Sequence, residues 1–311
     1  MTTAVTSMKS TDRSRRLATL VLVGVTATWG STFFLIRDLV LELPPTDFLA
    51  VRFTIAAAAM AVVFWRQLRA LNRRQIQVGV GLGVLYAVAQ ILQTIGLAHT
   101  DASRSGFITG TYVVLTPILT AILLRERIPR STWVAVLMAT AGLATMSLSG
   151  FGFGLGESVT LLAAVFYALH IIGLGRHSSA AAAAGLSAVQ MIVIAVVSLV
   201  AAAPGGISLP HGTGAWASVL YMALMAGAVA IWGQTWAQSH LPATRAAIVM
   251  TLEPVFAAVF AVTLGGESMT ARMLLGGGLV LAAMYTVELI GRRTDLTAEQ
   301  NPPAELLHHE V

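Results

Sequence analysis

The amino-acid sequence predicts an all-α membrane protein with ten transmembrane helices, arranged as two inverted five-helix repeats. Of its 311 residues, 56% are hydrophobic and only 11% are charged, whereas soluble domains carry roughly 25% charged residues. The hydrophobic residues form ten long runs, and the second half of the chain repeats features of the first. A soluble enzyme and a nucleic-acid-binding protein are excluded, because 19 basic and 14 acidic residues cannot cover the surface of a soluble chain this long.

The ten runs have the length that a membrane requires, since a bilayer core of about 30 Å needs roughly 20 apolar residues per helix. The first run, residues 17–36, has no charge and is longer than the h-region of a signal peptide, which has about 7–15 residues. We therefore expect an uncleaved first helix. The other expected helices cover residues 48–65, 76–97, 104–124, 132–149, 157–174, 182–203, 215–238, 243–264 and 271–290. Continuous rather than alternating runs favour helices over a β-barrel.

Polar segments flank the ten runs, and turn-forming residues such as Pro129 and Pro204-Gly205-Gly206 separate them. We expect residues 1–16 and 291–311 to be cytoplasmic tails without regular structure. The first repeat then covers residues 17–149, and the second, inverted repeat covers residues 150–290.

Lysine and arginine residues set the expected orientation. Fifteen of the 19 lie on one side of the predicted membrane, mainly in the N-terminal segment, the second and fourth connections and the C-terminal segment. The other side has Arg37, Arg52, Arg104 and Arg272. Because cytoplasmic loops carry an excess of Lys and Arg, we expect a multi-pass protein of the cytoplasmic (inner) membrane with both termini in the cytoplasm.

An internal repeat relates residues that are 141 positions apart. The identical pairs include Gln93 and Gln234, Thr94 and Thr235, His99 and His240, Arg104 and Arg245, and Glu126 and Glu267. Biased composition readily aligns Ala and Val but not Gln, His, Arg and Glu, so we infer a duplication. Each unit holds about five helices. Because five is an odd number, the second unit enters the membrane from the opposite side and has the inverted topology. Many secondary transporters have this arrangement, with the substrate site between the halves at the midplane.

Several motifs then resemble a known family. Residues 29–33 (WGSTF) resemble the WGS-type signature of the drug/metabolite transporter superfamily, and residues 252–256 (LEPVF) resemble its second EamA-type repeat. Residues 116–119 (TPIL) are the first-half counterpart, and the resemblance covers about residues 17–290. Residues 106–115 are similar to the amino-acid-exporting branch of this superfamily, typified by YddG.

The resemblance implies export of small metabolites, with aromatic and other neutral amino acids as the leading substrates. It also implies a central cavity lined mainly by the first, third, fourth, sixth, eighth and ninth helices, with the fifth and tenth as a peripheral scaffold. The sequence has no P-loop, so ATP is not the expected energy source. Coupling to protons and movement down the substrate gradient both stay open.

Glu253 and His170 are candidate substrate-binding residues because both are expected deep in the membrane. Glu253 lies about ten residues into its helix, and a carboxylate at the bilayer centre costs about 2.5–3.5 kcal/mol unless it faces a wet cavity. It is either a protonatable group or partner of a substrate ammonium, or a structural hydrogen-bonding group beside Pro254. His170 fits a proton relay or a buried neutral imidazole.

The remaining candidates are uncharged. Gln90 either contacts substrate or holds helices together, and Gln93 and Gln234 are weaker candidates because they lie near helix ends. Aromatic candidates inside the expected helices, which either stack on a substrate or fill the interior, are Trp29, Tyr86, Tyr112, Tyr167 and Trp232.

Two prolines, Pro117 and Pro254, are expected to bend their helices. Bends that free backbone carbonyls are tolerated in a membrane where they line a cavity. Each proline is either a hinge for alternating access or a static kink.

The sequence therefore predicts a secondary transporter that exports small metabolites by alternating access, and not an enzyme. An intramembrane enzyme would need a metal cluster, a Ser–His pair or paired carboxylates, and no such motif is present at depth. A multidrug or cationic-compound exporter of the same fold is the alternative, since a cation would suit Glu253. We expect no catalytic residue, metal, cofactor or nucleic-acid partner. The expected partners are the lipid bilayer and a small-molecule substrate, and the duplication makes a monomer sufficient.

Overall fold

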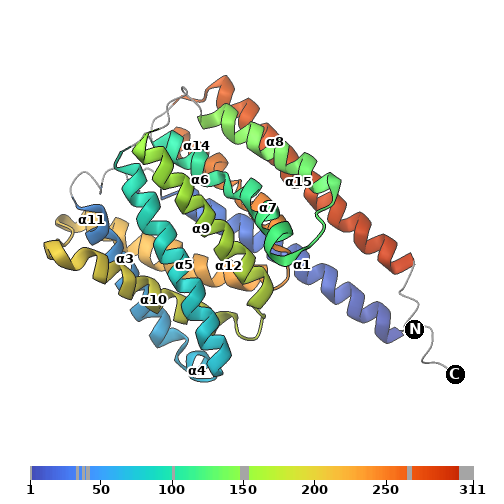
Figure 1. Cartoon of the computed structure of the whole chain (residues 1–311), viewed down its shortest axis with the longest axis horizontal. Helices are drawn as coiled ribbons and strands as arrows, with labels where there is room; N and C mark the ends of the chain where they lie inside the picture. Colours follow the sequence, from blue (N-terminus) through green and yellow to red (C-terminus); the bar gives the residue numbers. More distant parts are fainter. Residues whose placement is uncertain are drawn as a thin grey trace.

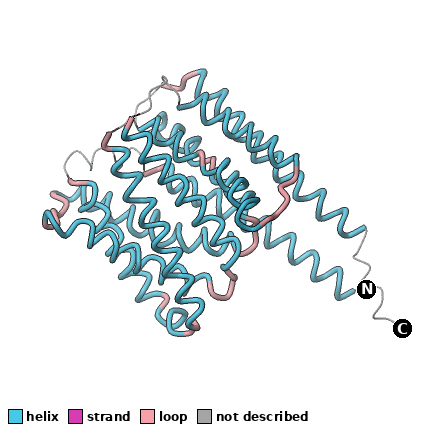
Figure 2. The backbone as a smooth tube through the Cα atoms, in the orientation of Figure 1, coloured by secondary structure: helices cyan, strands magenta, loops and turns pink. Residues whose placement is uncertain are grey.

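The computed structural model describes residues 2–32, 35–36, 39, 43–99, 102–147, 154–264 and 268–300. Within these ranges the chain is helical and contains no strand (Figures 1 and 2). The first half contains α1 (Thr2–Gly30), α3 (Pro45–Val63), the short α4 (Trp65–Arg69), α5 (Arg73–Leu97), α6 (Ala102–Gly110), α7 (Tyr112–Leu124) and α8 (Arg130–Ser147).

The second half begins with α9 (Leu155–His177) and α10 (Ala183–Ala202), which a 3₁₀ turn, η1 (Ala203–Gly205), extends. The next helical stretch consists of α11 (Gly212–Tyr221), a π-helical segment η2 (Met222–Val229) and α12 (Ala230–Gln238). The last elements are α13 (Ala243–Met250), α14 (Glu253–Thr263) and α15 (Ala271–Gln300). All ten predicted runs therefore lie mainly in helical segments, although some are interrupted.

The long apolar helices fit a protein that crosses a membrane. In the part of the chain that the structure describes, six helical stretches have the required length and composition: Pro45–Val63, Arg73–Leu97, Leu155–His177, Ala183–Gly205, Gly212–Gln238 and Ala243–Phe260. Ile108–Leu124 and Ala271–Thr286 are shorter apolar helices. Large apolar side chains also cover the outside of the bundle, among them Val62, Leu137 and Val200, which are 79%, 67% and 69% exposed. Such an exterior is suited to contact with lipid.

The predicted tails are helical where the structure describes them, so the expectation of irregular structure is wrong there. The first helix begins at Thr2, and the last continues to Gln300. The physical reason is that an apolar helix has already met the cost of nucleation, after which each added residue costs little when proline is absent. Residues 301–311 and the predicted repeat boundary at residues 149 and 150 lie outside the described ranges.

Helices of the two halves pack in matching ways. Helices α8 and α15 lie side by side at one edge of the bundle, and α3 packs against α10 (Figure 1). The contact of α5 with α9 corresponds to the contact of α12 with α1. The contact of α7 with α9 likewise corresponds to the contact of α14 with α1. In the same way, α6 contacts α8 and α13 contacts α15. In each case the 141-residue repeat relates one contact to its counterpart, so the duplication extends from the sequence to the packing.

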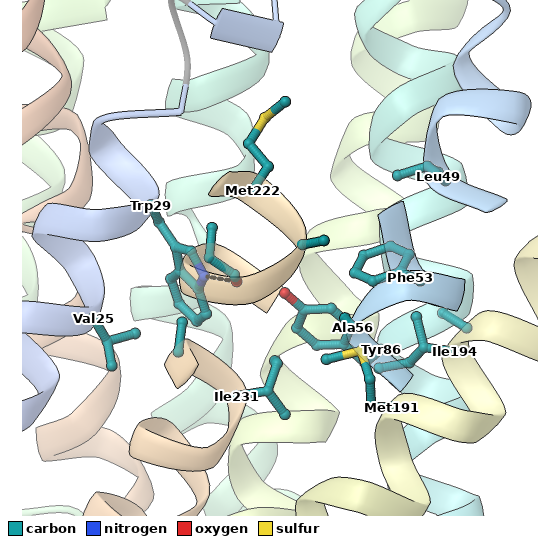
Figure 3. Packing of buried hydrophobic residues seen from close by; sticks show 14 of the residues in the cluster. Val25, Trp29, Leu49, Phe53, Ala56, Tyr86, Met191, Ile194, Met222 and Ile231 are labelled. Carbon is teal, nitrogen blue, oxygen red and sulfur yellow. Dashed lines mark hydrogen bonds between the residues drawn. The ribbon is translucent and has the colours of Figure 1, made fainter. Parts of the chain in front are cut away.

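The buried core has two main parts. The larger joins α1, α3, α10, η2 and α12 through side chains such as Phe53, Met191 and Ile231 (Figure 3). The smaller joins α7, α8, α13 and α15 through side chains such as Leu143 and Val280. This arrangement leaves α8 and α15 at the periphery and brings the other long helices together around the centre.

Candidate functional site

A cavity of about 350 Å³ lies at the centre of the bundle. Its wall includes residues of α1, α3, α5, α6 and α7 from the first half and of α9, α12, α13 and α14 from the second. Among the described residues, α8 and α15 contribute nothing to the wall, as the family resemblance implies for the fifth and tenth helices. The contribution of α3, through Phe48, Leu49 and Arg52, was not expected.

The structure brings seven of the eight predicted substrate-binding residues together. The residues on the cavity wall are Trp29, Tyr86, Gln90, Tyr112, Tyr167, His170 and Glu253. Trp232 is not on the wall: its side chain is 39% exposed, and its ring centroid lies 5.8 Å from that of Phe64. Trp232 therefore packs at the outer surface of the bundle.

The WGS motif of α1 contacts three other elements. The indole Nε1 of Trp29 donates a hydrogen bond of 2.9 Å to the carbonyl oxygen of Ala226 in η2 (Figure 3). A side chain at Gly30 would place its Cβ within 2.8 Å of three atoms of α14. The Ser31 hydroxyl lies 2.7 Å from the Tyr221 hydroxyl at the end of α11. Each residue of the motif thus has a packing or hydrogen-bonding reason for its identity.

Hydrogen-bonded side chains of α5, α6 and α9 form one part of the cavity wall. The Tyr167 hydroxyl donates to Gln93 Oε1 at 2.7 Å, and Gln93 Nε2 donates to the Thr109 hydroxyl at 3.1 Å. Gln90 Nε2 donates to the Tyr86 hydroxyl at 3.2 Å, and the rings of Tyr86 and Tyr167 meet edge to face with centroids 5.6 Å apart. Gln93 therefore belongs to the wall, although its position near a helix end made it a weak candidate.

The equivalent glutamine of the second half, Gln234, also lines the cavity. Its Nε2 donates to Gln238 Oε1 at 3.1 Å and lies 3.7 Å from the sulfur of Met250. Gln238 Nε2 donates to the carbonyl oxygen of Ile171 at 2.9 Å, which fixes the orientation of the Gln238 amide. Gln238 Oε1 therefore faces Gln234 and accepts from its Nε2. Gln234 Oε1 is consequently left buried without a hydrogen bond.

Four pairs of cavity residues are related by the internal repeat. The pairs are Trp29 and His170, Gln93 and Gln234, Thr109 and Met250, and Tyr112 and Glu253. The contact of Gln93 with Thr109 is repeated as the contact of Gln234 with Met250. Tyr112 is the first residue of α7, and Glu253 is the first residue of α14. Both halves therefore build the cavity from equivalent positions.

His170 joins three helices beside the cavity. Its Nε2 lies 2.8 Å from Gln190 Oε1, on α10. Gln190 Nε2 donates to the Thr235 hydroxyl on α12 at 3.4 Å and to the carbonyl oxygen of Leu186 at 3.3 Å. These donations fix Gln190 Oε1 as an acceptor, so His170 Nε2 carries a proton and donates it. The imidazole is thus held in one orientation against the Tyr86 ring, 5.1 Å away between centroids.

The cavity wall carries two opposite charges that do not pair. Within the described residues, the Glu253 side chain forms no hydrogen bond or ion pair, and Arg52 forms no ion pair. Arg52 is 5% exposed, although the sequence analysis placed it among the charges outside the membrane. Its position inside the apolar run 48–65 was the missed signal, because an ionisable residue within a membrane helix is rare and usually functional.

Neither proline coincides with the helix interruption in its half of the chain. Pro117 is inside α7, and the break between α6 and α7 is at Thr111. Pro254 is in the first turn of α14, where its missing N–H breaks no helical hydrogen bond. The break before α14, at Thr251 and Leu252, occupies the position that the repeat relates to Thr111.

Comparisons with solved structures and curated proteins agree with this architecture. A solved crystal structure superposes with a TM-score of 0.76, covering 90% of this chain and 99% of the other. The two sequences are 18% identical, so this likeness shows the fold alone. A protein of Streptantibioticus cattleyicolor named as a probable terminal-alkyne amino-acid exporter is 27% identical over 150 residues, which is 47% of each chain.

An uncharacterized transporter of Archaeoglobus fulgidus is 31% identical over 276 residues, which span 88% of this chain and 87% of that protein. A second uncharacterized transporter of the same organism is 23% identical over 274 residues, 86% of this chain and 97% of that protein. The EamA-like transporter family matches residues 16–148 and again residues 154–289. The long apolar helices suit a bilayer, and both halves of the chain match the family model. This multi-pass membrane protein therefore belongs to the EamA-like transporter family.

Proposed function

We propose that this transporter exports aromatic and other neutral amino acids from the cytoplasm. The observation that carries the proposal is Glu253, whose carboxyl group pairs with no residue that the structure describes and lies on the wall of a cavity that Trp29, Tyr86, Tyr112 and Tyr167 also line. A carboxylate binds a substrate ammonium through charge-assisted hydrogen bonds, and aromatic rings accommodate an apolar or aromatic side chain. A volume of about 350 Å³ is at the lower end of the range for small-molecule sites, about 300–1,000 Å³.

We further propose that ten helices span the membrane as two inverted repeats, residues 17–149 and 150–290, with both termini in the cytoplasm. The matching helix contacts of the two halves support this arrangement, as do the equivalent cavity positions. Rocking of one repeat against the other would then open the cavity to each side in turn.

Export of cationic compounds is the second candidate. Glu253 and the aromatic wall favour a cation, but Arg52 lines the same cavity and repels one. The name of the probable amino-acid exporter also favours amino acids for this chain. The more similar relatives are named only as uncharacterized transporters, so they do not confirm the closer similarity to the YddG branch.

Uptake into proteoliposomes tests the proposal. Labelled phenylalanine, leucine and a quaternary ammonium drug would each be supplied with and without an imposed pH gradient. We expect saturable uptake of the two amino acids, and stimulation by the gradient would indicate proton coupling. Saturable uptake of the drug without uptake of either amino acid, by folded protein, would overturn the proposal in favour of the second candidate.

A further inference from the structure

One buried cation of the cavity has no role in the proposed function. Arg52 lies on α3, is 5% exposed and lines the cavity. Glu253 is the one acidic residue among the described residues of the wall, and it forms no ion pair with Arg52. A buried charge without an opposite charge beside it is costly, so its position on the wall of a binding cavity suits a ligand that supplies the opposite charge.

The guanidinium of Arg52 is held in place by one of its three nitrogens. Its Nε donates to the carbonyl oxygen of Met222 at 3.3 Å, and its Cζ lies 5.0 Å from the centroid of the Phe53 ring. Met222 begins the π-helical segment η2, which also supplies the carbonyl of Ala226 that binds Trp29. Carbonyl oxygens of η2 thus orient two cavity residues from α1 and α3.

The two terminal nitrogens of Arg52 are available to a ligand. They form no hydrogen bond with any residue that the structure describes, and they are absent from the fully buried polar atoms that lack a partner. They therefore reach the open space of the cavity. Two adjacent N–H groups in one plane match the two oxygens of a carboxylate.

We propose that Arg52 is the carboxylate-binding residue of the transport site and that Glu253 binds the ammonium group of the same substrate. This inference rests on the proposed function and adds a selection rule to it. A cavity with one basic and one acidic side chain on its wall favours a zwitterion over an amine, which leaves Arg52 unpaired, and over a carboxylic acid, which leaves Glu253 unpaired.

The test compares ligands that differ in the carboxylate alone. Equilibrium binding to purified protein would be measured for phenylalanine, its amide and phenethylamine, which has the same ring and amine but no carboxyl group. The variants are Arg52→Gln, Arg52→Lys and the control Arg69→Gln, whose arginine is exposed on α4 outside the cavity wall. Thermal unfolding of each variant would show that it is folded.

For the unaltered protein and the control we expect phenylalanine to bind at least about tenfold more tightly than either analogue. Arg52→Gln should remove this preference, because it weakens phenylalanine binding, whereas phenethylamine loses the repulsion by Arg52 and binds at least as tightly as before. Arg52→Lys should restore part of it, because lysine keeps the charge but not the planar pair of donors.

Two results would overturn the inference while the proposed function stands. One is equal binding of phenylalanine and its amide by the unaltered protein, which needs no variant to fold. The other is a folded Arg52→Gln variant that keeps the preference. If the unaltered protein binds phenethylamine but does not bind or transport phenylalanine, the proposed function itself is wrong.

Discussion

Glu253 begins α14 with its carboxylate on the cavity wall and no side-chain partner among the described residues. We expect Glu253→Gln, which removes the charge at nearly constant size, to reduce saturable phenylalanine uptake by about tenfold or more, as expected for a lost charge-assisted hydrogen bond. Initial rates of uptake in proteoliposomes check this. If Glu253 also exchanges protons, the variant should lose the pH dependence of the rate.

The control for this substitution is Glu126→Gln, because Glu126 is exposed in the connection after α7. It should transport like the unaltered protein. Full uptake by folded Glu253→Gln, with an unchanged pH–rate profile, would restrict Glu253 to a structural role beside Pro254.

At the scale of elements, the close packing of α1 against α14 requires a residue without a side chain at position 30. A Cβ there would lie 2.7 Å from the Phe256 Cβ and 2.8 Å from the backbone nitrogen of Ala257, so the helices would have to separate. We expect Gly30→Ala to lower the free energy of unfolding by about 1–3 kcal/mol, the usual cost of overpacking. Gly24→Ala is the matched control on the same helix, since a Cβ at Gly24 meets nothing within 4 Å. Equal melting temperatures for the two variants would contradict this reason for the glycine.

The break between α13 and α14 is a candidate flexible point. Alanine at position 254 would restore an N–H that can bond the Met250 carbonyl and continue the helix across Thr251 and Leu252. If the break moves during transport, Pro254→Ala should slow turnover by about fivefold or more with little change in phenylalanine affinity. Pro117→Ala, inside α7, changes a proline away from the break and serves as the control. An unaltered turnover rate for Pro254→Ala would make the break a static kink.

The positions of the helices were predictable because long apolar runs are sufficient to identify helices in a membrane. Their orientations about their own axes were not, because apolar side chains face both lipid and protein in such a helix. Trp232 and Tyr86 therefore look alike in the sequence, yet one packs at the outer surface and the other lines the cavity. The π-helical segment had no sequence signal, so the anchor of Arg52 at Met222 was also unpredictable.

On the scale of the whole molecule, the equivalent residues Gln93 and Gln234 offer a test of alternating access. The sequence contains no cysteine, so an introduced thiol is unique. If the two repeats exchange conformations, single-cysteine variants Gln93→Cys and Gln234→Cys should change in opposite directions when saturating phenylalanine is added. Labelling rates with a membrane-impermeant thiol reagent, applied from one side, measure this. Parallel changes at the two positions would argue against exchange between the repeats.

The unequal residues within the repeated pairs have a consequence for how a ligand lies in the cavity. If the two residues of every related pair were identical, the two halves of the wall would be equivalent. Any ligand would then have two equivalent poses, related by half a turn. Three of the four pairs differ, with Gln93 and Gln234 identical, and the repeat relates Arg52 to Val193, which carries no charge. The two halves thus give the cavity a repeated framework, and unequal residues at a few wall positions make its two ends chemically different. New substrates can then evolve by substitution in one repeat while the packing shared by both stays intact.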